Sequence, residues 1–147
     1  MAYDYVRKLP YDRIYKNFID PKYVPIGENE YYLRDRQTSK PEGGWRHLRA
    51  DEIESLVNNK NVATNWDDIR VTDSFDTSMV KRNSFFGLVR IGRIQREILE
   101  YHDLRIPVGI TDSCIVSCDI GDDVAIHNVN YLANYIISDK CILFNVN

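Results

Sequence analysis

The sequence predicts a mainly β fold, a parallel β-helix that follows a small helical cap and an extended N-terminal arm. The first observation is a repeat, because Ile120–Asn130 returns 17 positions later as Ile137–Asn147, with five identical pairs. The second is a six-residue spacing of apolar residues that begins at Val108. A short fixed period is typical of a stacked solenoid, in which each repeat buries its apolar face against the next.

Composition limits the class of protein and its partners. The chain has 147 residues and a net charge of −3. This length suffices for one domain with a hydrophobic core, and the lack of a basic excess argues against nucleic-acid binding. No stretch is long and apolar enough to span a bilayer, and charged residues near the N-terminus interrupt any signal peptide. We therefore expect a cytoplasmic protein with no nucleic-acid partner and no membrane partner.

Residues 1–44 are predicted to form a Tyr/Pro-rich extended arm. They contain seven of the ten tyrosines and four of the five prolines. Because proline lacks a backbone N–H and fixes φ, these prolines interrupt regular hydrogen bonding. We expect the arm to pack its tyrosines onto another surface, to form a short helical turn around residues 12–18, and to end at Gly43–Gly44.

Residues 45–107 are predicted to form the helical cap and the first strands. The stretch Asp51–Lys60 has a helical period, with acidic residues at its start and a lysine at its end, as the helix dipole favours. Its apolar face is expected to carry Ile53, Leu56 and Val57. The run Phe85–Gly92 is rich in β-forming residues, whereas Ile94–Leu99 is compatible with either a strand or a helix.

Residues 108–147 are predicted to begin the β-helix, with about two coils. Alternate residues of a strand share a face, so each six-residue unit supplies one short strand with two inward residues and a bend. Three units make a triangular coil of about 18 residues, and the period of 17 is one coil with a single residue deleted. The inward residues of the two copies are Val124, Ile126, Cys141 and Leu143.

Polar residues of the repeat are expected at the surface and the corners of the coils. Asparagine and aspartate tolerate left-handed backbone, which suits the corners. The corner pairs are Asp122 with Asp139, and Asn128 with Asn145. We expect Asp119 and Asp123 at the coil surface or at a corner as well.

His127 is the one candidate catalytic residue. It directly follows inward Ile126, so its imidazole should point outward, where it could act as a general base. Its counterpart in the second copy is Phe144, and the alternative is that the imidazole stacks on this ring. No complete catalytic motif and no phosphate-binding glycine loop are present, so enzymatic activity is left open and no cofactor is expected.

Three cysteines invite a metal interpretation that we do not favour. The spacing of Cys114 and Cys118 resembles that of zinc ligands, but no fourth ligand lies close in sequence. Cys141 aligns with Val124 and is expected to be a small buried hydrophobe. The sequence therefore predicts no metal site.

Three stretches resemble a known family: Trp45–Leu56, Asp73–Asp76 and Ile120–Tyr135. On these residues the chain is similar to the start of a long, uncharacterised bacterial family of left-handed β-helix proteins with hexapeptide repeats. That family is described as similar to UDP-N-acetylglucosamine pyrophosphorylases. The resemblance implies a left-handed coil, and it implies that this chain corresponds to the N-terminal part of a longer protein.

Two functions from different classes remain. The first is a β-helical scaffold or assembly module, whose open C-terminal end stacks on further β-helix coils or on another copy, because exposed strand edges normally require a partner. The alternative, which the resemblance implies, is part of a transferase acting on sugar nucleotides or acyl-thioesters, with His127 near its site.

Overall fold

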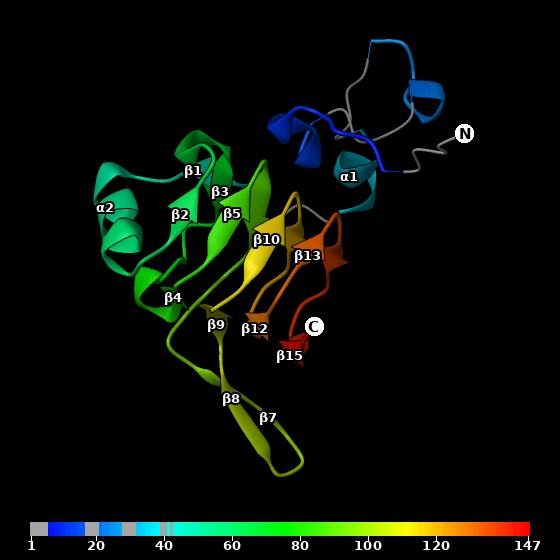
Figure 1. The fold of residues 1–147 in the computed structure, drawn as a ribbon. Coiled ribbons are helices and arrows are strands. Elements are labelled where there is room, and N and C mark those ends of the chain that lie inside the picture. Colours follow the sequence, from blue (N-terminus) through cyan, green and yellow to red (C-terminus); the bar gives the residue numbers. More distant parts are fainter. Residues whose placement is uncertain (1–5, 17–20, 28–31, 39–40, 42) are drawn as a thin grey trace.

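The computed structural model describes residues 6–16, 21–27, 32–38, 41 and 43–147. The chain is mainly β, with few helices and with strands that run mostly parallel in three sheets (Figure 1). The prediction of a mainly β fold with parallel strands is confirmed.

Each of the three sheets collects short strands from well-separated parts of the chain. Sheet 1 contains, in spatial order, β2 (Val62–Ala63), β5 (Ser84–Phe86), β10 (Cys114–Val116) and β13 (Leu132–Ala133). Sheet 2 contains β1 (Arg46–His47), β3 (Ile69–Val71), β6 (Val89–Ile91), β11 (Asp119–Ile120) and β14 (Ile136–Ile137). Sheet 3 contains β4 (Val80–Lys81), β9 (Gly109–Thr111), β12 (Ala125–Val129) and β15 (Ile142–Val146).

The chain visits sheets 1, 2 and 3 in this order and then returns to sheet 1. We call each such passage a circuit, and four circuits begin at β2, β5, β10 and β13. Strands before Val108 thus already pair in the same sheets as later ones. Between the third and fourth circuits the register offset equals the repeat period, since Ile120 pairs with Ile137 and Ile126 with Leu143.

An antiparallel hairpin interrupts the second circuit. Its strands β7 (Ile98–Tyr101) and β8 (Leu104–Pro107) lie between β6 and β9 in sequence. Figure 1 shows the hairpin projecting away from the three sheets. The segment that was compatible with strand or helix therefore leads into this hairpin.

The core lies between the three sheets. The predicted inward residues Val124 and Ile126 are fully buried, while Cys141 and Leu143 pack against the core from the last circuit. The six-residue spacing is wrong at one position, because the neighbour of Cys114, Ile115, is the buried residue. Asp112, two residues before this strand, has a φ of 53°.

The corners contain left-handed backbone, partly where it was expected. Asn128 and Asn145 have φ values of 57° and 54°. At the other corner the left-handed residues are Asp123 and Lys140, one position after the predicted aspartates. The reason is a hydrogen bond, since Oδ1 of Asp122 accepts a backbone N–H of the preceding circuit at 2.7 Å.

The first circuit is covered at its free end. Helix α2 (Ala50–Asn58) lies beside it, at the opposite end of the sheets from β13 and β15 (Figure 1). Leu56 enters the core as predicted, but Val57 is 49% exposed, and Glu52 is buried instead. Glu52 is held there by two hydrogen bonds from Arg46, at 2.7 and 3.0 Å.

Short helical turns complete the chain. In the described parts of the arm they are η1 (Tyr11–Ile14), η2 (Pro21–Tyr23) and α1 (Tyr32–Gln37), and beside the first circuit they are η3 (Trp66–Asp68) and η4 (Thr77–Met79). The arm is therefore not simply extended. The rings of Tyr11 and Phe86 lie 6.2 Å apart, while Tyr11 is 71% exposed, so packing of the arm's tyrosines stays a prediction. None of the described helices has the length and apolarity to cross a membrane, and the cytoplasmic location stays a prediction.

Candidate functional site

The predicted catalytic residue lines a groove of about 480 Å³ between sheet 3 and the base of the hairpin. Neighbouring strands of sheet 3 place Lys81, Thr111, His127 and Phe144 side by side in register. Ile106 and Pro107 of the hairpin form the facing wall. Apolar and polar side chains both line the groove, since Met79, Val108 and Phe144 lie there together with Arg82, Asp112 and Asn128.

Both ring nitrogens of His127 are engaged. Nε2 lies 2.7 Å from the carbonyl oxygen of Pro107, and Nδ1 lies 2.7 Å from the hydroxyl of Thr111. Because a carbonyl oxygen can only accept, Nε2–H donates to it, and a neutral ring then accepts the Thr111 hydroxyl hydrogen at Nδ1. The imidazole thus bridges sheet 3 to the end of the hairpin.

This geometry is more easily explained by a structural role than by proton transfer. To act as a general base, His127 must give up one of its two hydrogen bonds. The neighbouring acid, Asp112, is already paired with Arg82 at 2.6 and 3.0 Å and does not orient the ring. The general-base role stays a prediction. The predicted stacking partner Phe144 does lie next to His127 in register.

A second constellation, a buried charge cluster on sheet 2, was missed at the sequence level. Asp119 is 1% exposed, so its expected place on the coil surface was wrong. Arg90 donates two hydrogen bonds of 2.6 Å to its carboxylate, and Arg34 and Thr38 of the arm each donate one of 2.5 Å. Arg90 also binds Asp35 at 2.6 Å, so the cluster fastens α1 to the sheet.

The cluster holds its central carboxylate ionised. Burial alone would raise the pKa of Asp119, but the hydrogen bonds from Arg90 and Arg34 outweigh this effect and the pKa lies below its ordinary value. The guanidinium of Arg90 additionally stacks on the Trp45 ring, 4.6 Å from its centroid. No signal in the sequence marks this pair, because Arg90 and Asp119 lie on paired strands but are separated by 29 residues that include the hairpin.

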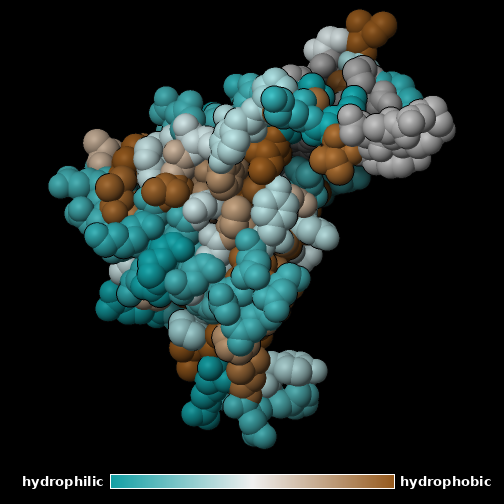
Figure 2. Space-filling model, viewed as in Figure 1, coloured by the Kyte–Doolittle hydropathy of each residue, from teal (hydrophilic) through white to brown (hydrophobic). Residues whose placement is uncertain are grey.

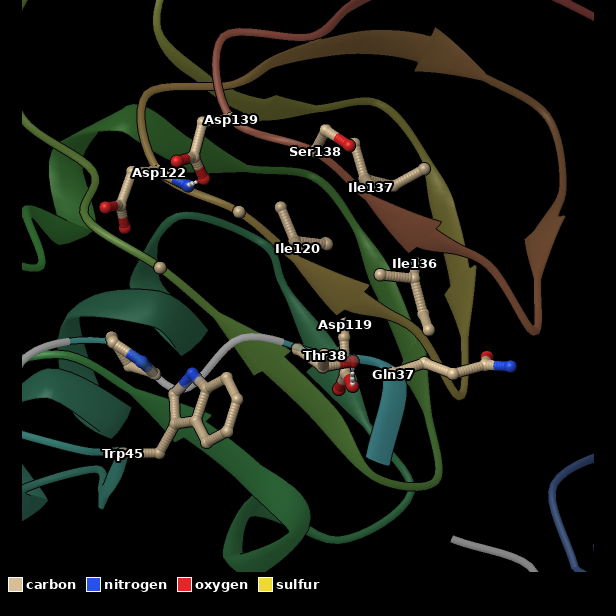
Figure 3. Close-up of a pocket in the computed structure, with 13 residues that line it drawn as sticks. Gln37, Thr38, Trp45, Asp119, Ile120, Asp122, Ile136, Ile137, Ser138 and Asp139 are labelled. Carbon is tan, nitrogen blue, oxygen red and sulfur yellow. Dashed lines mark hydrogen bonds between the residues drawn. The ribbon is translucent and has the colours of Figure 1, made fainter. Parts of the chain in front are cut away.

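A pocket of about 300 Å³ adjoins this cluster (Figure 3). Trp45 lies on one side, the aspartates of two successive circuits lie on the other, and Gly121 lies at its floor. Asp139 accepts the backbone N–H of Asp122 at 2.7 Å, repeating the bond that Asp122 makes one circuit earlier. The pocket walls therefore belong to the stacking framework itself.

The cysteines do not converge. Cys118 is buried, and its Sγ lies 3.2 Å from the carbonyl oxygen of Val116, while burial raises the pKa of this thiol. Cys114 in β10 and Cys141, directly before β15, are free and partly buried. In the described part of the chain no three His, Cys, Asp or Glu side chains gather closely enough to hold a metal ion.

The last circuit presents open strand edges. β13, β14 and β15 are the terminal strands of their sheets and pair on one side only among the described residues. The side chains Asn128 and Asn130 donate to Asn145 and Asn147, at 2.8 and 3.0 Å, so two asparagine ladders run up to this edge. Phe144 is 53% exposed there.

The fold thus defines a mainly β protein of short strands that pair mostly in parallel, with α2 beside the first circuit. Residues 45–147 match a family model described as a domain of unknown function, DUF4954, and the chain belongs to this family. An uncharacterized protein of Treponema pallidum (strain Nichols) is 42% identical over 130 residues, which cover 88% of this chain and 18% of the relative. The chain therefore spans less than a fifth of that relative. No solved structure matches this chain.

These comparisons correct the family expectation. The resemblance to hexapeptide-repeat proteins similar to UDP-N-acetylglucosamine pyrophosphorylases was wrong, because the matching family is a domain of unknown function and the relative is uncharacterized. The transferase-like character was predicted from this resemblance and is wrong as well. The six-residue spacing arises from three short strands per circuit, which is a property of backbone geometry and identifies no enzyme family.

Proposed function

We propose that this chain is a β-helical scaffold or assembly module, in which the three sheets form the sides of a left-handed parallel β-helix. The repeated order of the sheets and the in-register strands support the helix. In Figure 1 the chain runs upwards along β10 in the foreground and passes to the back of the molecule at the top. It then runs downwards, comes forward at the bottom and continues into β13, further along the stack. That course supports a left hand.

The observation that carries the proposal is the difference between the two ends. At the first circuit, β1 pairs with β3 and α2 inserts Leu56 into the core. At the last circuit the ladders simply continue to the edge. Exposed edges are ready templates for further strands, and proteins that do not use them normally block them. The edges of β13, β14 and β15 are therefore the surface on which we propose that further circuits stack.

The last circuit also offers side chains that a further circuit could use. Asn145 and Asn147 each accept from the circuit below and keep their amide N–H groups for a circuit above. Such asparagine ladders stabilise other parallel arrays. Leu143 and Cys141 are only partly buried, and a further circuit would complete their burial.

The proposal is tested with a synthetic peptide of residues 131–147, which carries one complete circuit. Added to the chain, it should bind saturably and slow amide hydrogen exchange in β13, β14 and β15. The matched control is a scrambled peptide of the same composition. Equal effects of both peptides, or unchanged exchange at the edge strands, would rule out a strand-accepting edge.

A further inference from the structure

We infer that the β7–β8 hairpin is a dimerisation arm, whose tip enters the groove beside His127 of a second copy of this chain. This goes beyond the scaffold role, because it uses the hairpin and the groove beside sheet 3, which share only Phe144 with the open edge strands. The inference starts from the two faces of the hairpin and from the groove at its base.

The two faces of the hairpin differ in chemistry. Strand pairing places Leu99 opposite Ile106 and Tyr101 opposite Leu104, so these four residues share one face. The other face carries Glu100 and Arg105, which are joined by a hydrogen bond of 2.7 Å and face water. One face therefore carries four apolar or aromatic residues, and the other carries a charged pair next to Ile98 and Pro107.

The inner half of the apolar face is buried, whereas the outer half is exposed and its Tyr101 ring packs against the ring of His102, with centroids 4.3 Å apart. Ile106 is 5% exposed and Leu99 packs against the core. Further out, Tyr101 is 66% and Leu104 is 41% exposed. Figure 2 shows hydrophobic side chains on this projecting part of the molecule. A two-stranded hairpin is marginal in water by itself, so an apolar face that continues beyond the body requires something to cover it.

The groove supplies a surface of matching chemistry on the same chain. Its lining includes Met79, Val108 and Phe144, and Ile106 connects it directly to the apolar face of the hairpin. The groove and the outer hairpin thus form one continuous apolar surface. It is bent, because the hairpin projects from the sheets (Figure 1).

Charge favours a second copy as the occupant. The hairpin turn between Tyr101 and Leu104 contains Asp103, an exposed acid. The groove lining includes Lys81, an exposed base, and the charges of Arg82 and Asp112, which are paired with each other. An apolar pair with an adjacent acid therefore meets an apolar groove with an adjacent base, and both surfaces belong to this chain.

The proposed contact between hairpin and groove is reciprocal between two copies. When two copies pack the apolar faces of their hairpins together in opposite directions, each tip reaches the groove of the other copy. This exchange is related by a two-fold axis, so every contact occurs twice and the assembly ends at a dimer. His127 then acts as a positioning residue, because its bond to Pro107 fixes the angle between hairpin and groove.

The first test is sedimentation of the full chain over a concentration series. The double variant Tyr101→Ser/Leu104→Ser should raise the dimer dissociation constant at least about tenfold, since these are the buried anchors of the interface. The matched control is Ile98→Ser, which changes an exposed apolar residue on the opposite face. A wild-type chain that stays monomeric, or equal effects of both variants, would overturn the inference.

The second test fixes which groups meet. Asp103→Cys and Lys81→Cys are made in separate chains and mixed under mild oxidation. A cross-linked dimer should form in the mixture and not in either variant alone. Absence of this product refutes the tip-in-groove contact even if the chain associates through β13–β15. The cross-link can also form when the peptide of residues 131–147 fails to bind, so each proposal is tested independently of the other.

Discussion

Asp119 and Arg90 lie 29 positions apart in sequence and side by side in paired strands, where two hydrogen bonds of 2.6 Å join them. Each is almost completely buried, and Arg34 of the arm shares the same carboxylate. This pair connects the second circuit to the third and fastens the arm to both.

Replacing the central carboxylate should be costly. Asp119→Asn removes the buried carboxylate that Arg34 and Arg90 share, while Arg90 keeps its pair with Asp35. Removal of one partner of a buried pair costs about 3–5 kcal/mol. We expect a loss near the lower end of this range, since both arginines retain slight exposure. Chemical denaturation measures it. The control Asp123→Asn removes the exposed pair with Arg93 and should cost less than about 1 kcal/mol.

Stability should fall in acid. The folded pKa of Asp119 lies below its ordinary value, because the arginines overcome the effect of burial, and the same holds for Glu52 beside Arg46. Both groups then bind fewer protons folded than unfolded. Their contribution is present above about pH 4 and is lost as pH falls through the lower folded values. Unfolding free energies measured from pH 6 to pH 2 should show this loss, and Asp119→Asn should flatten it. An unchanged slope in the variant would contradict the assignment.

Gly121 should not tolerate a side chain. A Cβ at this position would lie 2.4 Å from Oδ1 of Asp139 and 2.8 Å from its backbone nitrogen. Because backbone atoms cannot move aside cheaply, Gly121→Ala should destabilise the chain by about 1–3 kcal/mol. Thermal denaturation measures the loss. Adding Asp139→Ala should restore only part of it, and full recovery would show that the backbone contact is unimportant.

His127 should matter for the hairpin and little for the core. His127→Ala removes the bonds to Thr111 and Pro107, which together contribute about 1–2 kcal/mol. We expect faster amide exchange in residues 98–107 and unchanged exchange in β10 and β11. Global destabilisation with uniform loss of protection would argue against a local bridge.

The sequence predicted the repeating circuits of the fold better than the hairpin and the arm. The 17-residue period placed Val124, Ile126 and the corner asparagines correctly, because stacking forces chemically similar residues into the same column. The earlier circuits were not predicted, because the hairpin and other insertions change their length and no constant period remains. The interior placement of Asp119 could not be anticipated, because its partners come from Arg90 across the insertion and from the arm.

The central claim is that the strands stack in circuits, with one end covered and the other open. Hydrogen exchange by NMR on the dilute monomer tests it most directly. The backbone N–H of Ala125 donates to the carbonyl oxygen of Cys141, so the backbone N–H and C=O groups of residues 141 and 143 point towards β12. Those of Ile142 and Phe144 point away from it.

The account predicts a slow amide at Leu143 between fast amides at Ile142 and Phe144, and slow amides throughout residues 125–127 of β12, which is paired on both sides. Uniformly slow exchange in β15 of the monomer, or alternation in β12, would contradict it.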